Sequence, residues 1–214
     1  MPYAGPALCG LYLVWMVNLF NFMDGIASVE AITTTLGGAL LLWWLAGSGT
    51  GWLVAVLFAG CVGGFLVWNF PPAKVFMGDA GSGFLGLMVA LLSLWCGQAS
   101  PALFWAWFTL IGCFMVDATT TLVRRVRRGE RFHEAHRSHA YQYAARQFGE
   151  HRPVTLAVGA INLLWLWPIA VAVALGWLDS VVGVAIAYAP LLLLAFRFKA
   201  GDRTAQESCS WQAH

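Results

Sequence analysis

The sequence predicts an all-α, polytopic integral membrane protein with about seven transmembrane helices. Hydrophobic residues make up 60% of the 214 positions, charged residues make up only 10%, and twelve residues are Trp. This fraction of hydrophobic residues is higher than in an ordinary soluble domain. The apolar residues form continuous runs, and a helix needs about 20 of them to cross a hydrocarbon core of ~30 Å. Strands of a membrane barrel would instead alternate in hydrophobicity.

The apolar runs that are long enough all belong to one predicted membrane domain, residues 1–214. We place the helices near residues 4–22, 30–46, 52–70, 82–98, 101–123, 153–176 and 181–198. The linkers at 46–51, 97–101 and 176–180 are short and contain neither Lys nor Arg. They therefore define one face of the predicted bundle.

All twelve basic residues lie at the other ends of the predicted helices. They are Lys74, Arg124, Arg125, Arg127, Arg128, Arg131, Arg137, Arg146, Arg152, Arg197, Lys199 and Arg203. Because Lys and Arg concentrate in cytoplasmic loops, we expect residues 23–29, 71–81, 124–152 and 199–214 in the cytoplasm and the first residue outside. Residues 124–152 then form a cytoplasmic basic loop. Polar segments that are far apart in the sequence can converge on this one face.

The first polar segment, NLFNFMDGIASVEA at residues 18–31, follows an apolar run and contains two amides and two carboxylates. These residues are Asn18, Asn21, Asp24 and Glu30. A carboxylate at mid-bilayer costs about 2.5 to 3.5 kcal/mol on insertion scales, so acids near helix ends usually face a wet cavity or a partner. Asp24 is therefore a candidate site residue. The alternative is that Asp24 only caps the helix that follows.

The second polar segment is AKVFMGDAGSGFLG, residues 73–86. Asp79 precedes small residues and a new helix, an arrangement that exposes backbone N–H groups to an anion. Lys74 adds a positive charge suited to phosphate, and Phe76 offers a flat aromatic face. Mg²⁺ prefers carboxylate oxygens together with substrate phosphate oxygens, so Asp24 and Asp79 together fit this ion. A helix cap at Asp79 is again the alternative.

The third polar segment is RRVRRGERFHEAHRSHAYQYAAR, residues 124–146. His133, His136 and His139 recur at intervals of three and could share one side of a helix, which raises the possibility of zinc. The surrounding arginines, and the lack of a thiolate or carboxylate to complete a tetrahedral set, speak against zinc. In HRSH, the guanidinium of Arg137 is flanked by two imidazoles, and these groups together can bind a pyrophosphate from several sides.

The other charged residues near this segment have simpler interpretations. Glu130, Glu134 and Glu150 lie among arginines and are expected to pair with them. The arginine run at 124–128 is typical of a solvated face or of a contact with anionic lipid. Asp117, about two helical turns before that run, is either an intramembrane ion-pair partner or a cavity residue.

In this order and at these spacings, NLFNFMDGI, AKVFMGDAGSGFLG and AHRSHAYQ closely resemble the bacterial polyprenyl-phosphate N-acetylhexosamine-1-phosphate transferases, also called glycosyltransferase family 4. The resemblance covers essentially the whole chain. It implies transfer of a sugar 1-phosphate from a UDP-sugar to undecaprenyl phosphate, with release of UMP, as the first membrane step of a cell-envelope glycan. It also implies Mg²⁺, membrane lipids as surroundings, and a site on the cytoplasmic face of the bacterial inner membrane. A homodimer is a possible assembly, and no nucleic-acid partner is expected.

The resemblance further implies roles for individual residues. Asp24 and Asp79 would be catalytic, and Asp79 would be the metal ligand. Phe76 would stack on the uracil. The other substrate-binding residues would be Asn18, Asn21, Lys74, His136, Arg137 and His139, of which the last three would hold the diphosphate. The physical logic agrees, because an anionic acceptor that attacks an anionic phosphorus needs a metal and cations to offset the repulsion.

Two features depart from the family pattern. Family members carry further N-terminal helices and an adjacent pair of aspartates in their first cytoplasmic loop, whereas this sequence has no Asp-Asp pair. The family also usually repeats the acid as Asp-Gly-Ile-Asp-Gly. Here either Ala27 replaces the second Asp or one Asp-Gly-Ile unit is missing. We therefore expect the chain to represent the C-terminal two-thirds of a longer family fold.

Two other functions remain open from the sequence. The first is a catalytically inactive remnant that still binds a UDP-sugar or a lipid phosphate. The second is an ion-coupled transporter whose intramembrane acids move ions. The clustering of polar groups on one face, and the lack of acids near helix centres, speak against the transporter.

Overall fold

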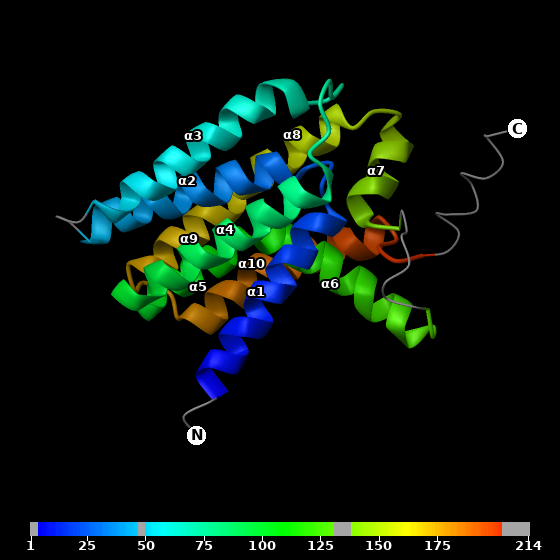
Figure 1. Cartoon of the computed structure of the whole chain (residues 1–214). Helices are drawn as coiled ribbons and strands as arrows, with labels where there is room; N and C mark the ends of the chain where they lie inside the picture. The colour runs from blue at the N-terminus through cyan, green and yellow to red at the C-terminus, as the bar shows by residue number, and fades with distance from the viewer. Residues whose placement is uncertain (1–3, 47–49, 131–137, 203–214) are drawn as a thin grey trace, which may run out of the picture.

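The computed structural model describes residues 4–46, 50–130 and 138–202, and in these ranges all regular secondary structure is helical (Figure 1). The helices are α1 (Ala4–Phe22), α2 (Ala27–Ala46), α3 (Gly51–Asn69), α4 (Gly78–Ala99), α5 (Pro101–Leu110), α6 (Gly112–Arg127), α7 (Ala140–Phe148), α8 (Arg152–Ile161), the π-helix η1 (Asn162–Leu166), α9 (Trp167–Ala174) and α10 (Ser180–Arg197). Within the described residues, 6 helices are long and apolar enough to cross a membrane, or up to 7 with α5 and α6 as one span. The predicted all-α membrane fold is confirmed.

The helices pack as neighbouring pairs around large apolar side chains. α1 packs on α4, α2 on α3, α5 on α9, and α6 on α10. Trp107, Phe20 and Phe114 are completely buried in this core. Trp107 can lie against α2 because Gly38 faces it, and a Cβ at Gly38 would be only 2.1 Å from the indole ring. Small residues allow such close approach of helices in membranes.

The helix predicted at residues 101–123 is broken, which corrects the sequence prediction. α5 and α6 meet at Ile111 and are bent by 67°. Gly112 lies at the junction, where a Cβ would be 2.9 Å from the Tyr188 ring of α10, so α10 packs closely only because residue 112 lacks a side chain. α5 is apolar throughout, whereas α6 carries Asp117 and ends in arginines. The bend therefore separates an apolar helix, α5, from an amphipathic helix, α6.

A π-helical turn interrupts the helix predicted at residues 153–176. Its first residue, Asn162, donates through Nδ2 to Glu30 Oε2 at 2.6 Å and to Thr33 Oγ1 at 2.7 Å. Glu30 is fully buried. A π-turn changes the spacing of the side chains along a helix, and such turns are uncommon without a specific cause. Glu30 therefore belongs to a buried link between α2 and η1 and does not share the surroundings of Asp24.

The two ends of the bundle carry different loops and helices, and these are grouped as the distribution of Lys and Arg predicted. The turn at 23–26, the loop at 70–77, α7 and the start of α8 gather at one end, on the right of Figure 1. The end of α2, the start of α3, and the connections from α4 to α5 and from α9 to α10 lie at the opposite end. The segment expected as a basic loop contains a helix, α7, which the sequence reading did not foresee. We call the end that holds α7 the polar end.

The orientation of the polar end can be tested by labelling single cysteines in right-side-out membrane vesicles, starting from a cysteine-free protein. Lys74→Cys and Gln147→Cys should be protected from a membrane-impermeant thiol reagent, because segments rich in Lys and Arg stay in the cytoplasm. Thr50→Cys and Asp179→Cys should react directly. All four should react in detergent, which controls for local burial. Labelling of Gln147→Cys in sealed vesicles would reverse the orientation.

Candidate active site

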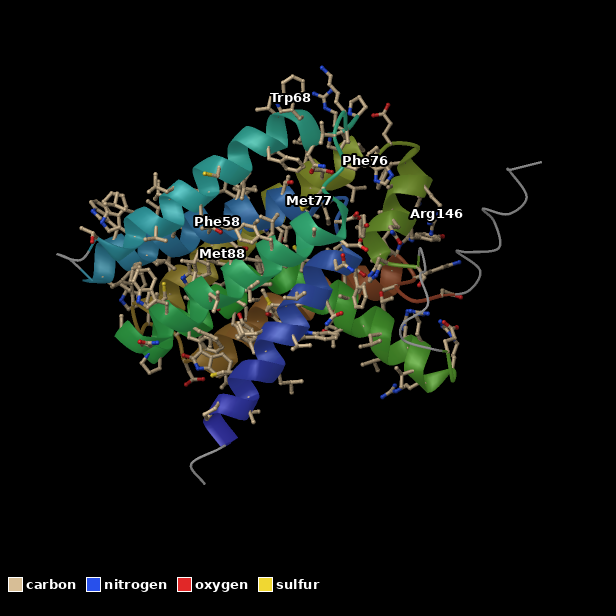
Figure 2. All side chains as sticks on the ribbon, in the orientation of Figure 1. Phe58, Trp68, Phe76, Met77, Met88 and Arg146 are labelled. Carbon is tan, nitrogen blue, oxygen red and sulfur yellow. The ribbon has the colours of Figure 1, made fainter. Side chains whose placement is uncertain are left out.

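A cleft with a volume of ≈ 930 Å³ opens at the polar end. The turn at 23–26 and the loop before α4 form one wall, and α7 with the start of α8 forms the other. Figure 2 shows Phe76 and Met77 on the loop and Arg146 on α7 at this end of the molecule. Residues that are more than a hundred positions apart in the sequence, such as Asp24 and Tyr141, therefore line the same cleft.

The first wall carries the carboxylate of Asp24. This residue is half-buried in the turn between α1 and α2. Burial raises the pKa of the Asp24 carboxyl, a hydrogen bond with the Gly25 backbone lowers it, and the negative charge of Asp79 raises it further. The two acids that the sequence singled out separately are thus close enough to repel each other. A cation near both would relieve this repulsion.

The loop at 70–77 is held by Asn69, the last residue of α3. Asn69 accepts a hydrogen bond from Ser28 Oγ at 2.8 Å and donates to the Val75 carbonyl at 3.0 Å. The next side chain, Phe76, lines the cleft and is 81% exposed, so its ring is free to stack on a ligand. The ammonium of Lys74 lies 5.7 Å from the Trp68 ring and outside the cleft lining. Asn69 was not predicted as a site residue; the only signal for it in the sequence is an amide between an apolar run and Pro-Pro.

Asp79 lies in the first turn of α4 and is exposed. The N-cap of that helix is Met77, so Asp79 does not occupy the capping position that the alternative interpretation assigned to it. One turn further, Ser82 Oγ donates to Asn21 Oδ1 at 3.0 Å, which ties α4 to the end of α1. Asn18 instead donates to the Val14 carbonyl within its own helix, at 2.7 Å, and lies outside the cleft lining.

The second wall consists of polar and basic side chains. They are Tyr141, Gln142, Arg146, His151 and Arg152, and the acidic Glu150 lies among them. None of them was predicted as a site residue. Tyr141 and Gln142 lie inside the AHRSHAYQ motif, which was the only sequence signal for them, whereas Arg146 and Arg152 become neighbours of the site only through the fold. This wall places positive charge opposite Asp24 and Phe76, an arrangement suited to an anionic ligand with an aromatic group.

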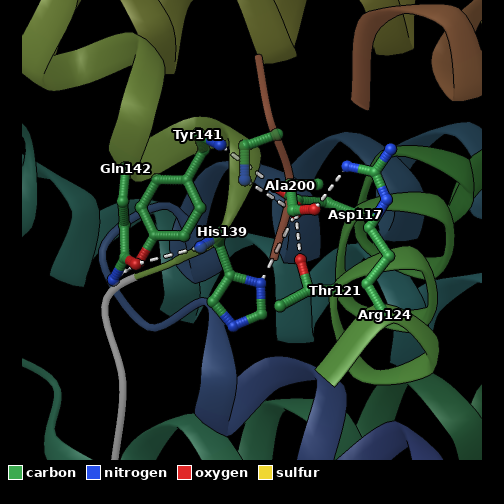
Figure 3. A network of polar contacts seen from close by, with 8 residues as sticks. Asp117, Thr121, Arg124, His139, Tyr141, Gln142 and Ala200 are labelled. Carbon is green, nitrogen blue, oxygen red and sulfur yellow. Dashed lines mark hydrogen bonds and ion pairs between the residues drawn. The ribbon is translucent and has the colours of Figure 1, made fainter. Parts of the chain in front are cut away.

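Asp117 holds the second wall in place (Figure 3). Its Oδ1 accepts a hydrogen bond from the Ala140 backbone N–H at 2.9 Å, and its Oδ2 accepts one from the Tyr141 backbone N–H at 3.1 Å. Thr121 Oγ1 donates to the same carboxylate at 3.2 Å. The sequence left Asp117 as an ion-pair partner or a cavity residue. The structure places it in the lining of an apolar cavity, where its carboxylate also caps the first turn of α7. The positive end of the α7 helix dipole also stabilises a carboxylate at this position.

Of the residues that the resemblance assigned to the diphosphate, the structure describes only His139. Its Nδ1 lies 3.5 Å from Asp117 Oδ1, and its ring stacks near Phe22 and Tyr141 with centroid separations of 6.1 Å in both cases. His139 is 1% exposed and does not line the cleft. His136 and Arg137 lie outside the described residues. Their contact with a diphosphate therefore stays a prediction, and so does that of His139.

The zinc alternative and the predicted ion pairs have different outcomes. His133 also lies outside the described residues, and no group of three or more His, Cys, Asp or Glu side chains converges in the ranges that the structure describes. Glu130 accepts from Arg125 and from Arg128, both at 2.9 Å, so its predicted pairing with arginine is confirmed. Glu134 falls outside the described residues, and Glu150 lies on the cleft.

Comparison with known proteins confirms the predicted resemblance. Residues 1–97 match the family model described as glycosyl transferase family 4. The chain is 30% identical over 161 residues to a "Probable undecaprenyl-phosphate N-acetylglucosaminyl 1-phosphate transferase" of Bacillus subtilis, a match that covers 72% of this chain and 44% of that protein. It is 31% identical over 139 residues to a "Phospho-N-acetylmuramoyl-pentapeptide-transferase" of Streptococcus thermophilus, covering 64% and 35%. A protein of the latter name from Moorella thermoacetica is 45% identical over 93 residues, covering 42% and 29%. The chain thus spans less than half the length of these relatives.

The exposed ring of Phe76 leads to a binding prediction. Phe76→Ala should weaken binding of UMP by about 1 to 3 kcal/mol, the usual loss when an aromatic side chain under a base is removed. Phe76→Trp, which keeps an aromatic face, should bind normally. Phe84→Ala removes another exposed ring from the same region and serves as the control. Titration calorimetry in detergent measures all four proteins, and equal affinities for Phe76→Ala and Phe84→Ala would contradict stacking.

Proposed function

The chain is related to glycosyl transferase family 4, and on this premise we propose that it transfers a sugar 1-phosphate of the N-acetylhexosamine type from a UDP-sugar to undecaprenyl phosphate. The matched relatives are named as an undecaprenyl-phosphate N-acetylglucosaminyl 1-phosphate transferase and a phospho-N-acetylmuramoyl-pentapeptide-transferase, and the residues that match the family model include the segments around Asp24 and Asp79. The second product would be UMP. Because residues 1–97 include one complete wall of the cleft, the relationship concerns the candidate site itself.

The observation that carries this proposal is the composition of the two walls of the cleft. One wall presents the Asp24 carboxylate and the exposed Phe76 ring, and the other presents Arg146 and Arg152. A UDP-sugar has an aromatic base and a diphosphate, which match the ring and the positive charges respectively. A membrane-embedded acceptor could reach the same cleft, because the helices that hold it are apolar enough to span the bilayer.

The reaction balances without an oxidant or a reductant. A phosphate oxygen of the polyprenyl acceptor forms a bond to the phosphorus that carries the sugar, and the bond from this phosphorus to the UMP oxygen breaks. UMP leaves with the electron pair of that bond. Both reactants are anions, so the protein must position them and offset their repulsion, and little covalent chemistry is left to its side chains.

The roles that we propose for the side chains come from the family resemblance; Asp24 and Phe76 line the cleft, whereas Asn21, Lys74 and Asp79 lie outside its lining. Phe76 would stack on the uracil, and Asn21 with Asp24 would contact the nucleotide or the polar groups around it. Lys74 would add positive charge near the phosphates. The described part of the basic segment would contribute through Tyr141 and the arginines of the second wall. The proposed contact of Asn18 with substrate has less support, because its amide N–H group already bonds within α1.

The donor groups of this end fit Mg²⁺. Asp24 and Asp79 are near enough to raise the pKa of Asp24 by repulsion, and Asp79 is exposed. Mg²⁺ commonly takes one or two carboxylates and completes its shell with water and substrate phosphates, so it needs no larger cluster of protein ligands. Asp79 would be the main ligand. When bound, Mg²⁺ would neutralise charge on the diphosphate.

We also propose that the cleft faces the cytoplasm of a bacterial cell. The basic residues that gather at the polar end support this orientation. The supply of UDP-sugars in the cytoplasm agrees with it.

The proposal is tested by incubating the purified chain with Mg²⁺, undecaprenyl phosphate and radiolabelled UDP-N-acetylglucosamine. We expect lipid-linked sugar and an equal amount of UMP. Asp79→Asn should lower the rate at least ~100-fold, because an amide oxygen binds a hard cation far less well than a carboxylate.

Asp179→Asn is the matched control, since this exposed aspartate is the N-cap of α10 and does not line the cleft. It should turn over at the wild-type rate. UDP-sugar binding without UMP release from the wild type would contradict catalysis and favour the inactive binding protein. Equal rates for Asp79→Asn and Asp179→Asn would contradict the role of Asp79.

A further inference from the structure

The link between α6 and α7 differs from an ordinary helix cap. At α10, Asp179 caps its own helix, because its Oδ1 accepts from the Val181 and Val182 backbone N–H groups at 2.9 and 3.1 Å. The carboxylate that caps α7 belongs to another helix, 23 and 24 residues earlier in the chain. The contact of Asp117 with α7 is therefore tertiary: it fixes where α7 begins relative to the membrane-spanning bundle.

Helix α7 needs such a link to keep a fixed position. It has only 9 residues, and isolated helices of this length are marginal in water. Its first backbone N–H groups have no partner within the helix and must be satisfied from outside. Both oxygens of Asp117 serve this purpose, and the side chain is only 9% exposed. Water therefore competes poorly for these hydrogen bonds.

The capped residues continue directly into the cleft. Tyr141 receives the bond from Asp117 through its backbone, while its ring lines the cleft and its hydroxyl lies against Gly25, where a Cβ would be 3.5 Å away. Gln142 Nε2 donates to the Tyr141 hydroxyl at 3.2 Å, and Gln142 Oε1 accepts from the His139 backbone N–H at 3.3 Å. A shift of the α7 start would thus move the cleft wall beside Asp24.

We propose that Asp117 is a positioning residue of the transfer site: its carboxylate sets the place of the α7 wall and thereby the affinity of the cleft for the UDP-sugar. The inference rests on the proposed function, because it assumes that the UDP-sugar binds between the two walls. Asp117 itself touches no substrate. It acts through the backbone of Ala140 and Tyr141 and through the His139 ring beside it.

The alternative is that Asp117 only stabilises the fold. A comparison of Asp117→Asn with Asp179→Asn distinguishes the two roles. Asp117→Asn and Asp179→Asn each replace a helix-capping carboxylate by an amide of the same shape. Both should lower the thermal midpoint, because each weakens a cap of one helix. Only Asp117→Asn should change the site. We expect its Kd for UDP-N-acetylglucosamine to rise ~10-fold, with a parallel rise in KM and less than ~3-fold change in kcat.

Hydrogen exchange supplies a readout that does not depend on ligand. In peptides covering residues 138–148, Asp117→Asn should exchange at least ~10-fold faster than the wild type, whereas Asp179→Asn should not. If Asp117→Asn cannot be recovered folded, Thr121→Val removes one hydrogen bond to the same carboxylate and leaves both backbone bonds in place. This milder variant should raise Kd ~3-fold and still exchange faster in α7.

The outcomes separate this inference from the proposed function. Wild-type protein that binds the UDP-sugar, with unchanged Kd in Asp117→Asn, would overturn the positioning role and leave the proposed function intact. Equal weakening by Asp179→Asn would show a general stability effect and would also overturn it. Wild-type protein that binds no UDP-sugar would overturn the proposed function, and with it the role of Asp117 toward that ligand.

Discussion

The start of α7 is capped by one carboxylate that reaches it from a different helix, α6. Asp117 lies on α6 and accepts hydrogen bonds from the first backbone N–H groups of α7. It can do so because the chain bends by 67° between α5 and α6, which directs α6 toward the polar end. The second wall of the cleft, with Tyr141 and Arg146, therefore rests on the bend and on this cap.

The cost of polar groups in a bilayer explains why all parts of the candidate site lie at one end. Charged side chains are expensive in the hydrocarbon region, so they gather at helix ends or find partners inside the bundle. Asp24 and Asp79 lie at helix ends, and Glu30 has a partner inside the bundle, Asn162. The same constraint places a wall with Asp24 and Phe76 opposite a wall with Arg146, Glu150 and Arg152. Under the proposed function, that combination would offer separate places for a metal ion, a base and phosphate groups.

The sequence predicted features that depend on local pattern, and it missed those that depend on distant partners. Apolar length gave the first helix with its observed bounds, 4–22, and the distribution of Lys and Arg gave the polar end. The break at Ile111 could not be foreseen, because the role of Gly112 comes from Tyr188, far along the chain. Asp117 was noticed but could not be assigned. Arg146 of α7 and Arg152 of α8 were identified only as basic residues of the expected cytoplasmic face, and only the fold brings them opposite Asp24.

The central claim is that a UDP-sugar binds between the two walls of the cleft. The most direct measurement is photolabelling of the purified chain with a UDP-sugar that carries a photoreactive group on the uracil, followed by mass spectrometry of the labelled peptides. The account predicts labels in residues 70–77 and in residues 138–152, both suppressed by excess UDP. Labels confined to other segments, or labels that UDP does not suppress, would contradict it.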